Sequence, residues 1–585
     1  MFKTLASSVR QYKRPSVLTL ILMIGEAVIE TLIPFITATR LINTIQEKGT
    51  SLEISDILLT GIILVVMSIC SLSCGGLAGF TAAKAAAGFA KNLRHDVFSR
   101  VQTFSFSNID KFSSSSLVTR MTTDVTNVQF SYMMIIRTAV RSPLMLIFSV
   151  TMAAIMGGLL AATFVVIIPV LVVGLIFVAK KAMPAFRSVF RRYDKLNESI
   201  EENVRAMRVV KGFSREEYEK VKFGKEADSI RDDFTKAERI VALNTPIMNF
   251  CMYFNMAFVL IVGSYLAINR IGGVNIGHLS ALLTYGMQVL MSLMMLSMIY
   301  VMITISAESA KRICEVLNET PDLADKPDAI ARIADGSIDF EGVSFKYSKD
   351  GKLNALSGID LHIASGMTVG IIGGTGSGKS SLVQLIPRLY DATEGCVRVG
   401  GEDVRDYCLA SLRDAVSMVL QKNLLFSGTI KDNLRWGNED ATDEEIEEAC
   451  RLAQADEFIK SFPDGYDTYI EQGGTNVSGG QKQRLCIARA LLKKPKILIL
   501  DDSTSAVDTR TDALIRRGFK EFIPETTKII IAQRVASVED ADMIIVMDKG
   551  TVVASGTHSE LIETSDIYRE VYTQQTVGGD FDEEK

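Results

Sequence analysis

Residues 367–381 read MTVGIIGGTGSGKSS, an apolar run that leads directly into a Gly-rich loop. The run predicts a buried strand, and the loop satisfies the pattern G-x-x-x-x-G-K-[ST] from Gly373 to Ser380. Glycine lets backbone N–H groups come close enough to cradle a phosphate. In this strand-loop-helix context the pattern is specific, and it predicts a nucleotide-binding α/β domain. The phosphate-binding candidates are Gly373, Gly374, Thr375, Gly376, Ser377, Gly378, Lys379, Ser380 and Ser381.

Two cofactors follow from this loop, namely ATP and Mg²⁺. Lys379 is expected to reach the β- and γ-phosphates, and the hydroxyl of Ser380 to bind Mg²⁺. Further along, KILILDDS (496–503) reads as a second buried strand that ends at Asp501. A carboxylate at that edge would hold Mg²⁺ through its water shell. A strand ending in Asp is a weak signal alone, but its distance behind the Gly-rich loop makes it strong.

Composition divides the chain into a membrane part and a cytosolic part. With 585 residues, 48% of them hydrophobic, it is too long for one domain and too apolar for an average soluble protein. We expect an α-helical six-span transmembrane domain fused to an α/β P-loop nucleotide-binding domain. The predicted boundaries are 1–319 for the transmembrane domain, 320–336 for a polar linker, 337–575 for the nucleotide-binding domain and 576–585 for an acidic tail.

The six spans are predicted from stretches without charged side chains. Residues 240–269 and 271–307 each exceed the roughly 20 residues that a span needs, so each holds one. The uncharged stretch 142–179 is long enough for two spans, with Gly157-Gly158 as the turn between them. Residues 57–80 and 16–37 give the remaining spans, although Glu26 and Glu30 interrupt the last of these.

The distribution of basic residues predicts the orientation. Lys and Arg gather at the N-terminus and after spans two and four, which places both termini in the cytosol. Spans two to five are expected to continue as long cytosolic helices, bent at 105–112 (SFSNIDKF) and around 211–217 (KGFSREE). The net charge of -5 gives no sign of a nucleic-acid-binding surface. The eight cysteines lack metal-ligand spacing and read as reduced thiols.

A third motif carries a family resemblance. NVSGGQKQRL (476–485) resembles the signature sequence of ATP-binding cassette (ABC) proteins, with Val477 in place of the usual Leu. Tyr347 in FKYS resembles the aromatic residue that stacks on adenine, and SAVD (505–508) resembles the D-loop. Gln421 in MVLQKN resembles the Q-loop glutamine, a catalytic and Mg²⁺-binding candidate. With six preceding spans, the resemblance covers almost the whole chain. It is to half-transporters of the ABC exporter family, in particular multidrug-type exporters of the bacterial plasma membrane.

The signature motif implies a partner. Its hydroxyl and N–H groups, ahead of a predicted helix, offer a second anion-binding surface. In the family, the Gly-rich loop (here 373–380) is called the Walker A motif and the strand that ends in Asp (here Asp501) the Walker B motif. Two nucleotide domains of the family pair head to tail, so that each ATP lies between one subunit's Walker motifs and the other's signature. The resemblance therefore implies a second ABC half-transporter as partner. The signature residues expected to contact nucleotide are Ser478, Gly479, Gly480 and Gln481.

Two residues depart from the pattern of efficient ATP hydrolases in this family. Asp502 stands where the family has a catalytic Glu, and its side chain is shorter by one C–C bond, roughly 1.5 Å. A misplacement of about 1 Å can cost on the order of 100-fold in rate. Gln533 stands where the family has a switch His; it can hydrogen-bond a γ-phosphate but cannot shuttle a proton. Together these departures favour a heterodimer in which this chain's own site hydrolyses slowly.

Substrate signals are thinner, and several alternatives stay open. Glu26 and Glu30 lie one helical turn apart in span one, where they would attract a cationic or amphipathic substrate or else pair with another span. A stripe along span six would line an adaptable cavity or, slightly favoured, simply pack. It comprises Met287, Met291, Met294, Met298 and Met302. The spans are expected to contact membrane lipid, and the expected activity is export of drugs or other small amphipathic molecules. The alternatives are lipid or peptide export, and an ATP-gated channel or regulatory subunit.

Overall fold

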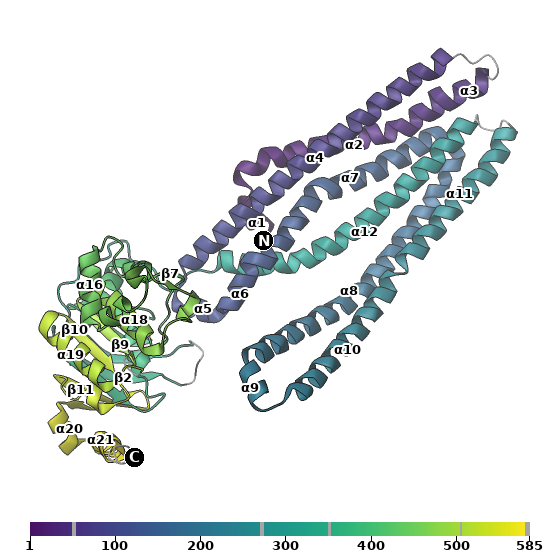
Figure 1. Ribbon diagram of the computed structural model, residues 1–585. Helices are drawn as coiled ribbons and strands as arrows, with labels where there is room; N and C mark the ends of the chain where they lie inside the picture. Colours follow the sequence, from purple (N-terminus) through teal and green to yellow (C-terminus); the bar gives the residue numbers. More distant parts are fainter. Residues whose placement is uncertain (49–53, 270–273, 349–350, 352, 504–505, 580–585) are drawn as a thin grey trace. The chain divides into compact units, whose positions relative to one another are not determined.

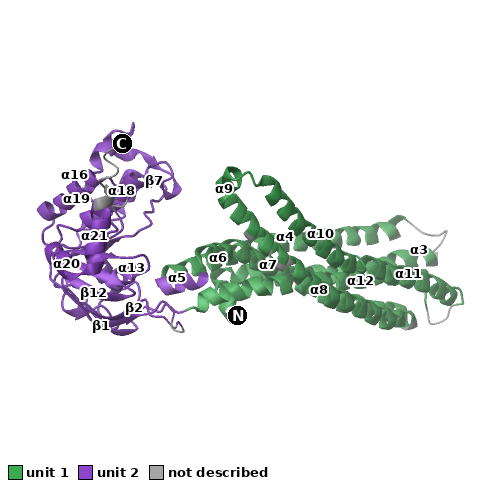
Figure 2. Cartoon of the chain, turned by 90° about the horizontal axis from the view of Figure 1, so that it is seen from below, with its two compact units in different colours: residues 1–103, 113–319 green, residues 104–112, 320–585 purple. Residues whose placement is uncertain are grey.

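The protein is described by a computed structural model. It covers residues 1–48, 54–269, 274–348, 351, 353–503 and 506–579. The chain divides into two compact units, drawn in different colours in Figure 2. Unit 1 contains Met1–Thr103 and Ser113–Glu319, and unit 2 contains Phe104–Phe112 and Thr320–Lys585.

Unit 1 is helical. Six of its described helical segments are long and apolar enough to cross a membrane, which confirms the predicted number of spans. They are Arg10–Gln46, Ile57–Gln102, Ser114–Gly157, Ala162–Phe186, Glu216–Ile268 and Ile276–Asn318. The helices of this unit, seen in Figure 1, are α1 (Phe2–Ser7), α2 (Lys13–Ile36), α3 (Asn43–Lys48), α4 (Ile54–Gln102), α6 (Ser114–Thr119), α7 (Val125–Gly157), α8 (Ala162–Arg205), α9 (Met207–Gly212), α10 (Glu216–Val241), α11 (Asn244–Ile268) and α12 (Ile276–Asn318).

The boundary between spans three and four follows the predicted glycine pair. Helix α7 ends at Gly157, and Gly158 has a φ of +48°, a left-handed conformation that glycine adopts without strain. A Cβ on Gly157 would lie 2.6 Å from the Leu282 side chain of α12, so α12 packs closely against this turn. The start of α7 differs from the prediction: the helix begins at Val125, well before the uncharged stretch, and carries Arg137 and Arg141.

Unit 2 is built around two larger sheets. The first has the order β2-β1-β4-β5, and the second the order β12-β11-β3-β10-β9-β6, with β7-β8 as a small pair. The strands are β1 (Ile338–Phe345), β2 (Leu356–Ile363), β3 (Thr368–Gly373), β4 (Glu394–Val399), β5 (Glu402–Asp403), β6 (Val416–Val419), β7 (Gly428–Thr429), β8 (Tyr469–Ile470), β9 (Ile497–Asp501), β10 (Thr527–Ile531), β11 (Met543–Asp548) and β12 (Thr551–Gly556).

The central strands explain why this half of the chain reads as apolar runs. Strands β9 and β10 are buried at every position, as expected for parallel strands covered on both faces. The helices of this unit are α5 (Phe106–Phe112), α13 (Lys379–Leu385), α14 (Leu409–Ala415), α15 (Ile430–Arg435), α16 (Asp443–Leu452), α17 (Asp456–Lys460), α18 (Gly479–Leu492), α19 (Thr509–Phe522), α20 (His558–Thr564) and α21 (Asp566–Gly579). Helix α5 belongs here although its neighbours in sequence belong to unit 1 (Figure 2).

Candidate nucleotide site

Strand order brings the predicted ATP residues to one edge of the larger sheet. Strands β3, β10, β9 and β6 are parallel neighbours, so their carboxyl ends meet. Ile531 of β10 is in register with Ile371 on one side and with Asp501 on the other. The phosphate loop, Asp502 and Gln533 therefore follow directly from three adjacent strands. Gln421 follows β6, the fourth.

The phosphate loop needs its glycines for different reasons. Gly376 and Gly378 have φ values of +81° and +98°, in the left-handed region that favours glycine. A Cβ on Gly378 would lie 2.9 Å from the carbonyl oxygen of Ala355, so the neighbouring chain also excludes a side chain. Above Gly374 and Gly376, by contrast, a Cβ would meet no described atom within 4 Å. The loop is thus tightly held underneath and open where a phosphate would bind.

The polar groups around the loop fit Mg²⁺-ATP. Lys379 Nζ donates to the carbonyl oxygens of Gly373 and Gly374, both at 2.9 Å, and burial lowers the pKa of its ammonium. Ser380 Oγ donates to Asp501 Oδ1 at 3.0 Å, which places a hydroxyl and a carboxylate side by side as Mg²⁺ ligation requires. Ser377 Oγ is buried and has no hydrogen-bond partner among the described residues. Phosphate oxygens and a metal would satisfy these groups.

Asp502 and Gln533 contact one another. Gln533 Nε2 donates to Asp502 Oδ2 at 2.8 Å. Asp502 has a φ of +51°, and its N–H donates to the carbonyl oxygen of Ile531 at 3.1 Å. Burial raises the pKa of the Asp502 carboxyl, while hydrogen bonds from Gln421 and Gln533 oppose that shift. The three residues that the resemblance assigns to catalysis thus form one cluster.

Tyr347 lies beside the helix that follows the phosphate loop. Its hydroxyl is 2.8 Å from Ser381 Oγ and donates to Gln384 Oε1 at 3.2 Å. Its side chain is 51% exposed, which leaves a ring face available for stacking. Tyr390 packs edge-on against it, with ring centroids 5.2 Å apart.

The signature residues form the predicted helix start. Ser478 caps α18: its Oγ accepts from the N–H of Gln481 at 3.3 Å, while Gln481 Oε1 accepts from the N–H of Ser478 at 2.9 Å. A Cβ on Gly480 would lie 2.8 Å from the carbonyl oxygen of Ala506. In the part of the chain that the structure describes, Ser478 and Gln481 bond to each other and to no residue of the phosphate loop. Ser505 of the predicted D-loop lies outside the described residues.

Sequence reasoning missed the partner of the two membrane carboxylates. Arg141 of α7 lies 3.4 Å from Glu26 and 2.5 Å from Glu30, both on α2. The Glu26 carboxylate also lies over Gly75 of α4, where a Cβ would approach within 3.1 Å. These ion pairs favour the alternative in which both carboxylates pair with another span. The signal for this pairing in the sequence was the position of Arg141, directly before the uncharged stretch 142–179.

Four of the five methionines of the stripe are exposed in this chain, whereas Met302 is half-buried. Met287, Met291 and Met298 are 53–54% exposed and Met294 is 38% exposed, all on one face of α12. Packing within the chain therefore does not account for them. They lie on a surface that membrane lipid, a partner or a substrate would cover.

Helix α5 contacts the nucleotide domain through Tyr390. The Tyr390 hydroxyl donates to Asp110 Oδ2 at 2.9 Å, and the Phe106 ring lies 6.0 Å from the Tyr390 ring, centroid to centroid. Burial, reinforced by Asp110, raises the pKa of the Tyr390 phenol. Because Tyr390 also packs on Tyr347, a single side chain joins α5 to the predicted adenine-stacking residue.

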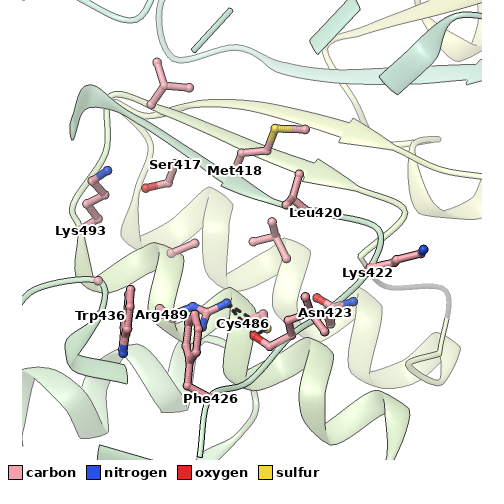
Figure 3. A pocket seen from close by; sticks show the side chains of 15 residues that line it. Ser417, Met418, Leu420, Lys422, Asn423, Phe426, Trp436, Cys486, Arg489 and Lys493 are labelled. Atoms are coloured by element: carbon pink, nitrogen blue, oxygen red, sulfur yellow. Dashed lines mark hydrogen bonds between the residues drawn. The ribbon is translucent and has the colours of Figure 1, made fainter. Parts of the chain in front are cut away.

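A groove lies beside the predicted Q-loop (Figure 3). It encloses about 380 Å³ between β6 and α18. The rings of Phe426 and Trp436 stack at its rim, with centroids 4.3 Å apart. Arg489 donates to the carbonyl oxygen of Leu424 at 3.2 Å within it. The groove is lined by apolar side chains together with three cationic ones, Lys422, Arg489 and Lys493.

Family models match both parts of the chain. The model described as "ABC transporter transmembrane region" matches residues 16–293, and the one described as "ABC transporter" matches residues 356–505. The chain is 34% identical to the uncharacterized ABC transporter ATP-binding protein YfiB of Bacillus subtilis, over 97% of this chain and 98% of that protein.

Other relatives carry more specific names. YgaD of Bacillus subtilis, named for multidrug export, is 37% identical over 65% of each chain. The ATP-dependent lipid A-core flippase of Desulfotalea psychrophila is 31% identical over 83% of this chain and 84% of its own length. A solved structure of a bacterial Atm1-family ABC exporter with ATP bound superposes with a TM-score of 0.83, at 25% identity over 96% of this chain and 98% of that one.

Proposed function

Because this chain belongs to the ABC transporter family, as a six-span half-transporter of its exporters, we propose that it is the slow-site subunit of a heterodimer. Its own Walker motifs hold Mg²⁺-ATP as a clamp, and its signature completes the partner's faster site. The pair exports drugs or other amphipathic compounds across the bacterial plasma membrane, with both termini in the cytosol.

The observation that carries this proposal is the contact between Asp502 and Gln533. A water that attacks the γ-phosphate needs a carboxylate that reaches it and a switch residue that responds to the phosphate. The Asp502 carboxylate is one C–C bond shorter than Glu, roughly 1.5 Å, and its backbone is pinned to Ile531. Gln533 stays neutral at every physiological pH, so the site lacks a second proton carrier. The arrangement suits retention of ATP better than turnover.

The signature supports the other half of the proposal. Ser478 and the first N–H groups of α18 are preorganised by the capping box. Such a surface can serve a partner's ATP without any change in this chain. A homodimer would instead contain two slow sites. A heterodimer is favoured because a partner with the catalytic Glu would provide one fast site.

We expect the two predicted bends of the cytosolic helices to link nucleotide state to the membrane domain. Helix α5 rests on Tyr390, next to the adenine side of the site. The turn between α9 and α10 is the second predicted bend. Phe213 in that turn is 75% exposed, which leaves an aromatic side chain on the surface of the bend. ATP-driven closure would then switch the spans between inward-facing and outward-facing states.

The transmembrane surface favours an amphipathic substrate over a simple cation. Arg141 neutralises much of the charge of Glu26 and Glu30, so these carboxylates attract cations weakly. The exposed methionines of α12 offer an adaptable apolar face. A lipid is the second candidate substrate, because one relative is named as a lipid A-core flippase.

The test is to measure ATP hydrolysis and vesicle transport with the chain alone and with a second half-transporter that has Glu after its Walker B Asp. We expect little activity from the chain alone and full activity from the pair. Rapid hydrolysis and transport by the chain alone would refute the heterodimer. Solute flux that needs ATP binding but no hydrolysis would instead indicate a channel.

A further inference from the structure

The C-terminal helix α21 contacts the loop that carries Gln533. The side-chain amide of Gln575 forms two hydrogen bonds with this loop, one at each end of the amide. Gln575 Oε1 accepts from the N–H of Val535 at 2.8 Å, and Gln575 Nε2 donates to the carbonyl oxygen of Gln533 at 2.8 Å. The amide therefore brackets Arg534 and pairs with the backbone as a neighbouring strand would.

This contact continues to the catalytic carboxylate. The backbone of Gln533 is held by Gln575, and the side chain of Gln533 donates to Asp502 at 2.8 Å. On the far side of the loop, Val535 is 1% exposed and Ser537 donates to Asp512 at 3.0 Å. At the end of the loop nearest Asp502, the N–H of Ala532 donates to the carbonyl oxygen of Ile371 at 3.2 Å, and Gln575 adds the hydrogen bonds that hold Gln533 and Val535.

Helix α21 is itself anchored well enough to act as a support. Tyr568, in its first turn, is fully buried and its hydroxyl lies 2.7 Å from Nδ1 of His558. Arg569 donates to the carbonyl oxygens of Ile562 and Glu563 at the end of α20, both at 2.6 Å. The start of α21 is therefore fixed by α20, and its later turns extend to Gln575.

We propose that Gln575 is a positioning residue for the ATP switch. By holding the backbone of Gln533 and Val535, it keeps the Gln533 side chain where it meets Asp502 and the γ-phosphate. The γ-phosphate role of Gln533 rests on the proposed function, whereas the support of the loop by α21 does not. Release of α21 would loosen the switch without altering the phosphate loop, so α21 couples the C-terminal end of the chain to ATP recognition.

The experiment compares Gln575→Ala and Gln575→Met with Gln574→Ala in the purified full-length chain. Methionine keeps the length of the side chain but makes neither bond. Gln574 is a matched control, because among the described residues its amide donates to Glu570 of the same helix, at 3.2 Å, and not to the loop. Hydrogen exchange of the peptide over 531–538, followed by mass spectrometry, reports the loop directly. Binding of ATP and of ADP reports the switch, since only ATP carries the γ-phosphate.

Both Gln575 variants should speed exchange of this peptide about tenfold, the effect of losing two neutral hydrogen bonds, while Gln574→Ala leaves it unchanged. They should also lower the preference for ATP over ADP about fivefold. The double variant Gln533→Ala/Gln575→Ala should be no worse than Gln533→Ala, because Gln575 acts through Gln533.

A hydrogen-exchange rate in Gln575→Met equal to that of the parent would overturn the proposal. So would a double variant whose loss of ATP preference is the sum of the losses in the two single variants. If exchange rises but Gln533→Ala leaves the ATP preference unchanged, the support by α21 stands, and it is the proposed role of Gln533 that fails.

Discussion

Replacing Asp502 by glutamate should raise the rate of ATP hydrolysis at this chain's own site by about 10- to 100-fold. The backbone at this position is fixed, because its N–H donates to the carbonyl oxygen of Ile531 at 3.1 Å. In the parent, the hydrogen bond from Gln533 to Oδ2 at 2.8 Å holds the carboxylate at the reach of an Asp side chain. An extra methylene must therefore move the carboxylate outward by roughly 1.5 Å, toward the position from which a family glutamate acts.

The magnitude follows from the sensitivity of catalysis to position. A misplacement of about 1 Å costs on the order of 100-fold, so restoring the reach should lower the barrier by about 1.4–2.7 kcal/mol. The change has a cost as well. Asp502 has a φ of +51°, a conformation that Asp tolerates better than Glu, so the variant should lose up to about 1 kcal/mol of stability.

The assay is phosphate release by the heterodimer after the partner's own Walker lysine has been replaced, so that all turnover comes from the Asp502 site. Asp502→Asn is the matched control, because it keeps the length and the hydrogen bond from Gln533 but removes the charge. It should be no faster than the parent. Adding Gln533→His to Asp502→Glu should raise the rate further.

Two results would refute this reasoning. The first is an unchanged rate in Asp502→Glu while ATP binding is intact, which would mean that carboxylate reach does not limit the site. The second is fast turnover by the parent with a silenced partner, which would mean that the site is not slow.

Three further predictions concern single side chains. Asp501→Asn should raise the Tm of the nucleotide-free protein at pH 7 by about 2–4 °C yet abolish stabilisation by Mg²⁺-ATP, because burial raises the pKa of this carboxyl. A raised folded-state pKa means that the native state binds the proton more tightly than the unfolded state. The stability of the parent should therefore fall as the pH rises from 3.8 through the raised pKa. Thermal unfolding measured across pH should show this slope in the parent and not in Asp501→Asn. Tyr390→Phe removes the 2.9 Å hydrogen bond to Asp110 and should lower transport per ATP hydrolysed about threefold or more while leaving hydrolysis intact, measured in vesicles. Arg141→Leu removes the ion pairs with Glu26 and Glu30 within the membrane and should sharply reduce the yield of folded protein, measured by size-exclusion chromatography.

Each of these has a contradicting outcome. A pH-independent difference between Asp501→Asn and the parent would remove the buried charge as the cause. Equal losses of transport and hydrolysis in Tyr390→Phe would indicate damage to the nucleotide domain in place of uncoupling. Rescue of Arg141→Leu by neutralising both carboxylates would support the ion pairs, whereas wild-type yield in Arg141→Leu itself would contradict them.

Local patterns in the sequence were enough for the spans and the phosphate loop. A membrane span needs roughly 20 consecutive apolar residues, and the phosphate loop needs fixed glycine spacing, so both signals lie within one short segment. The glycine turn at Gly157 and Gly158 and the cap at Ser478 were predictable for the same reason. The two departures were visible as well, because Asp502 directly follows a predicted strand and Gln533 stands where the resembled family has its switch His.

Contacts between distant segments were decided only by the tertiary structure. Register between β10 and β9 sets the contact of Gln533 with Asp502, and the strand order is not encoded in any local spacing. Helix packing brings Arg141 to Glu30 across 111 positions of sequence, so a rule that counts charges along one segment cannot pair them. The placement of α5 in unit 2 and the reach of Gln575 to the switch loop are of the same kind. The sequence by itself thus determined which chemical groups this exporter subunit possesses. Three-dimensional packing decided which of them touch, because hydrogen bonds and ion pairs act over a few ångströms in space, whatever their separation along the chain.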